Sequence, residues 1–324
     1  MSKKFITSIL KNIIGTILYI ICFPVFFLII CIKPFFHLRF GKINTIRYGT
    51  FCAQIFFFLD EIKKEESNFK KIDILGRDTI ISNSQLYKMA LREKVNIVPF
   101  STLTEFLRKG LRFWTRSKSF DSPMVNYLQK SFWGKNKENN VQIKFTEEEK
   151  IKGKNLIKKL GIPKNSEWIC IFNRDENYLN SLIKNKDWSY HSYRDFEPES
   201  LIEASNQFIK ENLYVVRLGS KTKKKLSSAN KKIIDYPNTD LSDDFLDVFL
   251  AANCKLYFGG DSGVNDIPLF FNKPVYLINC SLTLLKIYSE KFGKIFITKH
   301  LYSNKMKKYL SLREIFQSGL NGCS

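Results

Sequence analysis

The sequence predicts an α/β protein with two Rossmann-like domains facing a cleft, preceded by a hydrophobic membrane helix. Three observations predict this. Short apolar strands alternate with amphipathic helices after residue 36, which favours parallel sheets with helices on both faces. The 324 residues suffice for two domains. An almost unbroken apolar run precedes the alternation. We expect an anchor over residues 1–35, a first domain over 36–145 and a second over 146–324.

The apolar run covers residues 13–32 and contains no charge, so it is long enough to cross a bilayer as a helix. Basic residues flank both ends, so the positive-inside rule does not orient it. Pro24 lies in the middle and allows a kink. Two membrane arrangements remain open: a single span, or a segment that enters the membrane and returns to the same face. A buried helix of a soluble protein is the alternative, and a cleaved signal peptide fits less well.

The composition points to an anionic partner. The net charge is +21 with a pI near 9.6, which suits nucleic acid, an anionic membrane surface or a phosphorylated substrate. The seven cysteines are widely spaced, with no C-x-x-C pair and no Cys/His cluster. Neither a zinc site nor a disulfide framework is indicated, and a reducing cytosolic environment fits best.

In the first domain, helices and strands are predicted in alternation up to an irregular stretch over residues 117–140. We expect helices over 50–61, 84–93 and 101–114, and strands over 71–76 and 95–98. Ser101 is a plausible N-cap of the third helix.

The second domain begins with a helix over 146–160, where Thr146 and Glu149 resemble a capping box. Strands are expected over 167–172, 214–218, 232–235, 255–258, 275–278 and 294–298, with helices over 199–211, 242–252 and 310–317. This alternation predicts a parallel sheet with helices on both faces.

A glycine-rich turn, Gly-Gly-Asp-Ser-Gly over 259–263, is the most informative motif. It follows an apolar strand and precedes a short helix that Lys273-Pro274 ends. Glycine lets the backbone turn sharply and come close to a ligand. Ser262 and Gly263 would begin the helix, where free N–H groups and the dipole favour an anion. An ordinary strand-to-helix connection is the alternative.

Two further segments are expected at the same sheet edge. Arg174 and Asp175 follow the first strand of the second domain, and the segment from Arg217 through Ser220 to Lys221 ends the second strand. Ligands of open parallel sheets bind outside the carboxyl ends of the strands. Three loops with Arg, Lys, Ser and Gly at one edge favour a phosphorylated ligand.

The segment 187–196, Asp-Trp-Ser-Tyr-His-Ser-Tyr-Arg-Asp-Phe, is dense in polar and aromatic side chains. His191 is a candidate general base, because imidazole titrates near neutrality. Arg194 could hold a phosphate through two N–H groups. Asp175 is either a second base or a partner that fixes Arg174. The alternative is a loop of aromatic anchors with an ion pair between Arg194 and Asp195. No Asp-x-Asp pair lies beside the glycine turn, so bound Mg²⁺ is not expected.

Four segments resemble a family of bacterial glycosyltransferases associated with surface polysaccharide and lipopolysaccharide synthesis. Residues 38–49 are similar to its early Arg…Arg-Ile-Gly-His signature, and 173–175 with 191–195 resemble its central loops. Residues 214–219, Tyr-Val-Val-Arg-Leu-Gly, resemble one of its strands. Residues 259–263, followed by Lys-Pro-Val, resemble its glycine turn. The resemblance covers about residues 36–320.

The resemblance implies a GT-B architecture in which the C-terminal domain holds most of the donor nucleotide, usually without a metal. It implies that Arg174, Arg217, Ser262 and Gly263 hold the donor phosphates. We expect Arg194, Ser220, Lys221, Gly260 and Asp261 beside them. Arg47 and Gly49 would line the acceptor side. The family's histidine after Arg-Ile-Gly is Thr50 here, which leaves His191 and Asp175 as the base candidates. The negative charge of Asp261 is unexpected in such a turn, and we expect it to face a sugar hydroxyl or a lysine.

The expected function is therefore sugar transfer from a nucleotide-sugar donor to a surface glycan or lipid-linked acceptor. The enzyme would be anchored at the cytoplasmic face of the inner membrane, on an anionic surface, with no cofactor and no metal. The alternative is a non-catalytic membrane-bound module that binds phosphorylated glycans or nucleotides. Nucleic-acid binding rests on charge alone and is not expected, because no nucleic-acid motif is present.

Overall fold

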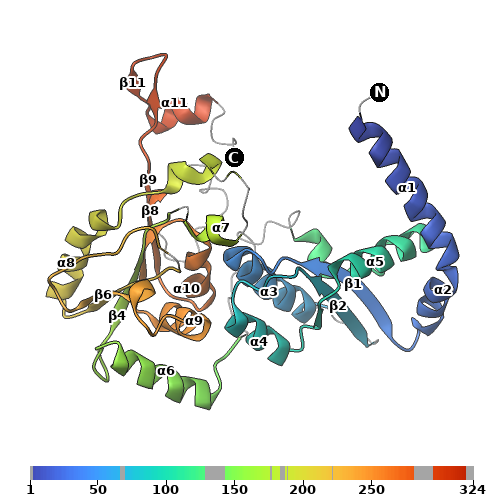
Figure 1. The fold of residues 1–324 in the computed structure, drawn as a ribbon, viewed down its shortest axis with the longest axis horizontal. Helices are drawn as coiled ribbons and strands as arrows, with labels where there is room; N and C mark the ends of the chain where they lie inside the picture. The colour runs from blue at the N-terminus through green and yellow to red at the C-terminus, as the bar shows by residue number, and fades with distance from the viewer. Residues whose placement is uncertain are drawn as a thin grey trace. The chain divides into compact units, whose positions relative to one another are not determined.

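The structure is a computed structural model that describes residues 3–65, 70–127, 143–175, 177–182, 187, 189–220, 222–280 and 295–318. The chain divides into two compact units. The first comprises Met1–Arg47, Gln54–Ser82 and Ala90–Lys130, and the second comprises Tyr48–Ala53, Asn83–Met89 and Ser131–Ser324. Two short segments from the first half of the chain, Tyr48–Ala53 and Asn83–Met89, therefore group with the second unit, and each lies at the start of a helix. Figure 1 follows the chain through both units.

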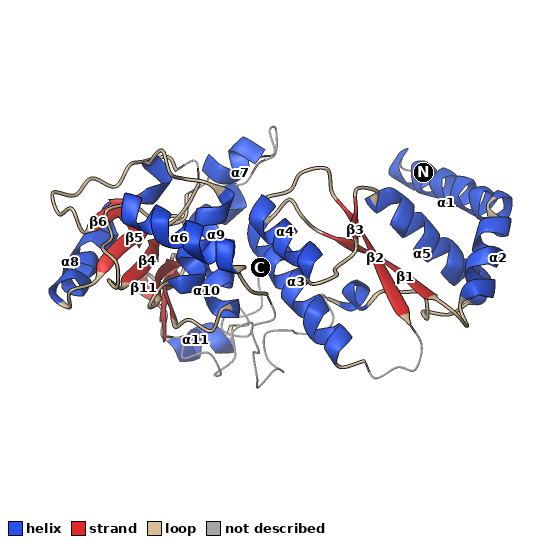
Figure 2. Cartoon of the chain, turned by 90° about the horizontal axis from the view of Figure 1, so that it is seen from below, coloured by secondary structure: helices blue, strands red, loops and turns tan. Residues whose placement is uncertain are grey.

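The first unit contains a parallel sheet of three strands in the order β1-β2-β3. The strands are β1 (His37–Ile43), β2 (Lys71–Arg77) and β3 (Ile97–Val98). The accompanying helices are α3 (Tyr48–Lys63), α4 (Ser84–Arg92), α5 (Ser101–Thr115) and the 3-10 helix η1 (Pro123–Asn126). In Figure 2, α5 and α3 lie on opposite sides of this sheet. The expected helices and β2 are confirmed, whereas Ser101 is not an N-cap: Phe100 occupies that position.

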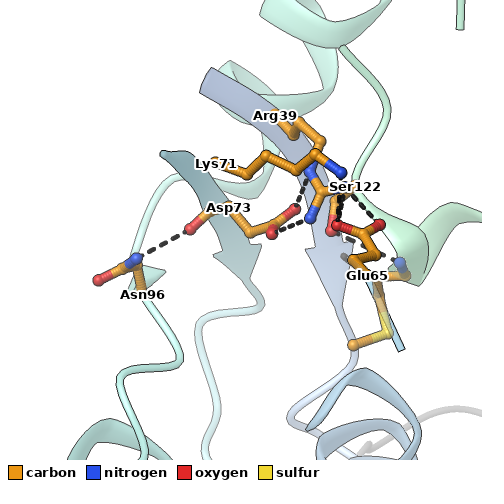
Figure 3. A network of polar contacts seen from close by, with 7 residues as sticks. Arg39, Glu65, Lys71, Asp73, Asn96 and Ser122 are labelled. Carbon is orange, nitrogen blue, oxygen red and sulfur yellow. Dashed lines mark hydrogen bonds and ion pairs between the residues drawn. The ribbon is translucent and has the colours of Figure 1, made fainter. Parts of the chain in front are cut away.

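Sequence reasoning missed β1, because Arg39 and Lys42 interrupt its apolar residues. The parallel register places Arg39 opposite Asp73 of β2. The Arg39 Nε donates to Asp73 Oδ1 at 3.0 Å, and Nη1 donates to Glu65 Oε1 at 2.6 Å. Lys71 Nζ reaches Glu65 Oε2 at 3.1 Å. Figure 3 shows this network, in which a buried arginine joins the two strands and Glu65, two residues after the end of α3.

The predicted membrane segment forms two helices, α1 (Lys3–Ile21) and α2 (Phe23–Ile32). Pro24 lies in the first turn of α2, so the predicted kink is confirmed. Among the described residues, no single helix has both the length and the apolar character to cross a membrane. Asn12–Ile21 and Phe23–Ile32 meet that criterion only as a pair bent by 62°. The continuous membrane helix that the sequence predicted is therefore not confirmed.

The second unit contains a six-stranded parallel sheet in the order β6-β5-β4-β7-β8-β9. Its strands are β4 (Trp168–Phe172), β5 (Tyr214–Arg217), β6 (Ile233–Asp235), β7 (Tyr257–Gly260), β8 (Val275–Cys280) and β9 (Ile295–Thr298). The first strand in the chain, β4, stands in the middle, and the later strands are added first on one side of it and then on the other. This is the doubly wound order, and the α/β fold predicted for this part of the chain is confirmed.

Helices cover both faces of this sheet (Figures 1 and 2). They are α6 (Glu147–Lys159), α7 (Asn177–Leu182), η3 (Ser189–Arg194), η4 (Pro198–Leu201), α8 (Ile202–Lys210), η5 (Tyr236–Asn238), α9 (Asp244–Asn253), η6 (Gly263–Asn265) and α10 (Asp266–Phe270). Side chains of β4 alternate between the faces, as expected for a strand. Ile169 and Ile171 pack with Leu201 in one core cluster, whereas the Cys170 Sγ contacts the Leu250 carbonyl of α9 at 3.5 Å.

At the two ends of the second unit, the predicted capping box is confirmed and a hairpin is present that was not predicted. Thr146 and Glu149 form the predicted capping box at the start of α6. The chain then closes with an antiparallel hairpin, β10 (Tyr302–Ser303) and β11 (Lys308–Tyr309), followed by α11 (Leu312–Gln317). The hairpin was not predicted, because two-residue strands are too short to show a period of two.

The Arg39 network generates a stability prediction. Replacing Arg39 by Met leaves the buried Asp73 carboxylate without its main partner, which typically costs about 3 to 5 kcal/mol. We expect Arg39→Met to lower the free energy of unfolding of the first unit by that amount in urea titrations in mild detergent. Lys42→Met, on the same strand, removes a partly exposed pair with Asp78 at 2.8 Å, in which the lysine faces solvent, and should cost only about 1 kcal/mol. Equal losses for the two variants would contradict a structural role for the network.

Candidate functional site

The candidate site lies at the carboxyl edge of the second unit's sheet, where the strand order reverses. Neighbouring strands β4 and β7 run parallel there, and the connections that follow them lead to opposite sides of the sheet. The loop after β4 is Asn173-Arg174-Asp175, and the turn after β7 continues from Gly260 through Asp261 to Ser262. Such a switch point leaves a crevice that binds ligands in open α/β sheets. The structure therefore brings together two of the three segments that the sequence singled out.

The third segment follows β5, next to β4, and is held by Arg217. This side chain is fully buried and its Nε donates to Asn173 Oδ1 at 2.9 Å. Its Nη1 donates to Asp235 Oδ1 at 3.0 Å and to the Lys224 carbonyl at 2.8 Å. A guanidinium with no exposed surface cannot touch a ligand phosphate in this conformation. The geometry gives Arg217 a positioning role, which differs from the direct phosphate contact that the sequence predicted.

The loop after β4 is fixed by partners on both sides. Arg174 is buried and its Nη1 forms an ion pair with Asp195. The Asn173 Nδ2 donates to the Phe196 carbonyl at 3.0 Å. Asp175 accepts N–H groups from Asn177 at 2.9 Å and from Lys223 at 3.0 Å. Asp175 therefore joins the loops after β4 and β5, and it is Asp195 that fixes Arg174.

The unexpected negative charge of Asp261 is compensated by an arginine. Its carboxylate is buried, and Oδ2 lies 3.4 Å from the Arg194 Nη1. The partner is thus an arginine of η3, where we had expected a sugar hydroxyl or a lysine, and the ion pair between Arg194 and Asp195 in the alternative interpretation of this loop is replaced by two crossed pairs. Arg174 meets Asp195, and Arg194 meets Asp261. The loop 187–196 is joined in this way to both sides of the switch point.

The glycines of the turn serve close packing. None of them has a positive φ, since the described glycines that do are Gly161 and Gly219. A Cβ on Gly263 would lie 2.5 Å from the Gly49 nitrogen, and a Cβ on Gly49 would lie 2.3 Å from the Gly263 Cα. A Cβ on Gly260 would lie 2.6 Å from the Phe196 ring. The start of α3 thus packs directly on the turn, which places the predicted acceptor-side Gly49 against the predicted donor-side Gly263.

The helix after the turn is a weaker anion site than the sequence predicted. Its first part, η6, has three residues and α10 has five, so the aligned peptide dipoles are few. The Ser262 N–H donates to the Asn265 Oδ1 at 2.8 Å and is occupied by the protein. Any ligand at this edge would depend mainly on side chains.

Four predicted site residues do not belong to the ion pairs described above. His191 lies in η3, but its side chain is outside the described part of the chain, as is all of Lys221. Ser220 is half-buried after β5. Arg47, in the first unit, is exposed and its N–H donates to Asn44 Oδ1 at 3.2 Å. Their predicted roles remain predictions.

Sequence reasoning missed a buried carboxyl near the start of α9. Burial raises the pKa of Asp247 to about 7, with Asp244 and Asp243 adding to the rise and a hydrogen bond with Tyr236 opposing it. Tyr48 and Tyr178 also face this group. Burial raises the pKa of the Tyr48 hydroxyl, and the Asp247 charge adds to the rise. Burial likewise raises the pKa of Tyr178 to about 12. The sequence gives no signal for Asp247, because Asp244–Asn253 reads as an ordinary amphipathic helix.

The charges at this edge are balanced. Arg174, Arg194 and Arg217 are each paired with one aspartate, so the site is a set of interlocked ion pairs on which a diphosphate would be the additional anion. Across the residues that the structure describes, no group of three or more His, Cys, Asp or Glu side chains is placed to hold a metal ion. The absence of a metal or cofactor in the reaction stays a prediction.

No protein-family model matches the sequence, and a search of curated proteins finds no match. Among solved structures, the chain resembles E. coli ADP-heptose LPS heptosyltransferase II (TM-score 0.46, 12% identity, 83% of this chain and 92% of that chain). It resembles a glycosyl transferase family 9 protein from Veillonella parvula (0.46, 11%, 81% and 87%). It also resembles E. coli heptosyltransferase WaaC with ADP-2-deoxy-2-fluoro heptose (0.39, 9%, 87% and 99%).

These structural neighbours are bacterial glycosyltransferases. At such identities and scores, the likeness does not identify a donor or an acceptor.

Asp247 generates a prediction on pH dependence. Because its native pKa of about 7 exceeds the unfolded value, the native state binds the extra proton between about pH 4 and 7. Stability therefore falls as the pH rises through that window. We expect Asp247→Asn to be more stable than the parent by roughly 4 kcal/mol at pH 8, and the difference to vanish near pH 4. Urea titrations from pH 4 to 8.5 measure this.

The matched control is Asp240→Asn, which changes an exposed carboxylate in the segment before α9. It should leave the pH profile of the parent unchanged. A stability difference for Asp247→Asn that does not vary with pH would contradict a shifted carboxyl at this position.

Proposed function

We propose that the chain is a glycosyltransferase and that the nucleotide diphosphate of its sugar donor binds at the crevice between the ends of β4 and β7. The observation that carries this proposal is the reversal of strand order at that point, with two paired arginines in the segments around it. Open α/β sheets bind nucleotides there. Guanidinium groups hold phosphates through several N–H groups at once.

Nicotinamide chemistry is less well supported at the same crevice. The dinucleotide fingerprint needs a G-x-G-x-x-G turn directly after the first strand of the sheet, where the pyrophosphate meets a helix start. In this chain β4 is followed by Asn173-Arg174-Asp175, and the glycines follow β7. A glycine-rich cradle of backbone N–H groups is thus replaced by side chains with fixed positive charge.

In mechanism, the paired arginines would neutralise the charge that develops on the departing nucleotide diphosphate. Arg194 and Arg174 are oriented in advance by Asp261 and Asp195. Donors that need no reorganisation during the reaction stabilise a developing anion most effectively. Arg217 would contribute indirectly, because it holds Asn173 and thereby the loop that carries Arg174.

A base is needed for the proton of the acceptor hydroxyl. His191 and Asp175 remain candidates, and two N–H groups already bind the Asp175 carboxylate. Asp247 joins them, since a pKa of about 7 suits proton transfer at neutral pH. The acceptor we propose is a surface glycan or a lipid-linked glycan at the cytoplasmic face of the inner membrane, with no bound metal.

The proposal predicts a specific loss in Arg194→Gln. Removing a charged hydrogen-bonding partner of the diphosphate should raise the KM for the donor about tenfold or more. The assay follows release of free nucleotide from a panel of UDP, GDP, CMP and ADP sugars, with lipopolysaccharide and lipid-linked glycans as acceptors. Lys255→Gln is the matched control, because Lys255 is an exposed cation just before β7 at the opposite edge of the sheet, paired with Glu167.

Equal KM values for the two variants would show that the donor does not bind at this edge of the sheet. A panel that gives no nucleotide release, while one nucleotide raises the melting temperature of the parent and not of Arg194→Gln, would instead support the non-catalytic binding module.

A further inference from the structure

The first unit carries an extensive apolar surface that the proposed reaction does not use. We call it the N-terminal apolar surface and define it by exposed side chains on the second half of α1, along α2 and at the end of α5. Representative exposed fractions are 50% for Ile17, 66% for Ile21, 55% for Phe27, 62% for Leu28, 46% for Phe113 and 37% for Trp114. Contiguous apolar surface of this kind marks a site for a partner protein or a membrane.

Close packing holds the three helices together. Phe26 of α2 is completely buried, and it fits against Gly110 of α5 so closely that a Cβ there would lie 2.2 Å from the ring. The Trp114 Nε1 donates to the Tyr19 carbonyl of α1 at 3.1 Å, and the Trp114 and Phe23 rings are 4.6 Å apart. Both ribbon views show α2 and the C-terminal end of α1 beside α5 (Figures 1 and 2). The surface is therefore built onto the unit and presented at a fixed angle.

Positive charge accompanies the apolar side chains. Lys109, Arg112, Arg116 and Lys118 are exposed in the last turns of α5 and just after it. No acidic residue occurs between Glu105 and Asp121, nor anywhere before Asp60. Aromatic residues beside lysine and arginine are typical of the interface between a bilayer and water. Each basic residue near an anionic surface contributes about 1 kcal/mol.

We propose that the N-terminal apolar surface inserts into one leaflet of an anionic bilayer without spanning it. Each apolar arm, Asn12–Ile21 or Phe23–Ile32, is about 15 Å long at 1.5 Å per residue, which matches half of a hydrocarbon core of about 30 Å. With one arm lying along the membrane surface, the bend of 62° directs the other arm into a single leaflet. The burial of Phe26 against α5 keeps α2 at the surface of the folded unit.

Charge favours lipid over a second copy of the chain. In a two-fold dimer the same patch meets itself, so the exposed Lys109, Arg116 and Lys118 would face each other, whereas Arg112 lies 3.9 Å from Asp121. An anionic bilayer satisfies both the apolar side chains and the cations. This inference does not depend on the proposed reaction.

Vesicle flotation of the full chain tests the proposal. We expect binding to phosphatidylethanolamine/phosphatidylglycerol vesicles and much weaker binding to phosphatidylcholine vesicles. Neutralising Lys109, Arg116 and Lys118 to Gln should lower the partition coefficient for the anionic vesicles about a hundredfold, from about 1 kcal/mol per charge. It should change the value for neutral vesicles little.

Two double variants with the same kind of substitution distinguish binding through the N-terminal apolar surface from binding through any exposed apolar side chain. Phe27→Ser with Leu28→Ser should reduce flotation at least tenfold, whereas Ile151→Ser with Leu312→Ser, both exposed in the second unit, should not. Circular dichroism confirms that each variant folds. Equal flotation of the two double variants would overturn the proposal.

A tag at the N-terminus distinguishes one-leaflet insertion from a span. With the folded units outside sealed vesicles, protease added outside should remove the tag. A protected tag would overturn the proposal in favour of a span. Self-association at micromolar concentration without vesicle binding would overturn it in favour of a second copy as the occupant.

Discussion

The buried guanidinium of Arg217 is the interaction on which the candidate site depends. Three strand ends meet at this side chain. Arg217 is the last residue of β5, its guanidinium donates to Asn173 after β4, and it pairs with Asp235, its register partner in β6. A buried charge is tolerated only when it is paired and hydrogen-bonded, so these strand ends cannot shift independently. The Asp235 carboxylate extends the constraint by accepting the Leu226 N–H at 2.9 Å. The segment after β5 is thereby folded back onto the sheet edge.

The same constraint explains why the site differs from a simple basic pocket. Once Arg217 fixes Asn173, the next residue, Arg174, is aimed at Asp195, and Arg194 in the adjoining loop meets Asp261. Each arginine is oriented by a carboxylate before any ligand arrives, and such orientation is what makes fixed charges effective toward a developing anion. The pairing also limits non-specific binding of phosphate, because an incoming anion competes with aspartates already in place.

Much of the fold could be predicted from the sequence, because hydrophobic periodicity and the residues that start or end helices and strands are local properties. The strands of the second sheet, the helix starting at Thr146 and the kink at Pro24 follow from such signals. The pairings could not be predicted, since neither Arg194 with Asp261 nor Gly49 with Gly263 is local in the chain. The strand β1 was missed for the same reason: Arg39 looks like an interruption until Asp73 lies opposite it. The glycine turn was located correctly, but its glycines are explained by close packing on α3.

Asp247 follows from the crowding of acids at the start of α9. Asp243 caps the helix, its Oδ1 accepting the Leu246 N–H at 2.6 Å, and Asp244 binds the Ser84 N–H at 2.7 Å. The helix dipole favours negative charge there, but three carboxylates within two turns repel one another. Asp243 and Asp244 both accept hydrogen bonds from backbone N–H groups. Asp247 has a buried oxygen that accepts no hydrogen bond, and burial raises its pKa to about 7. A helix start that favours anions thus carries, one turn further in, a carboxyl with a raised pKa against Tyr48 and next to the contact of Gly49 with the glycine turn.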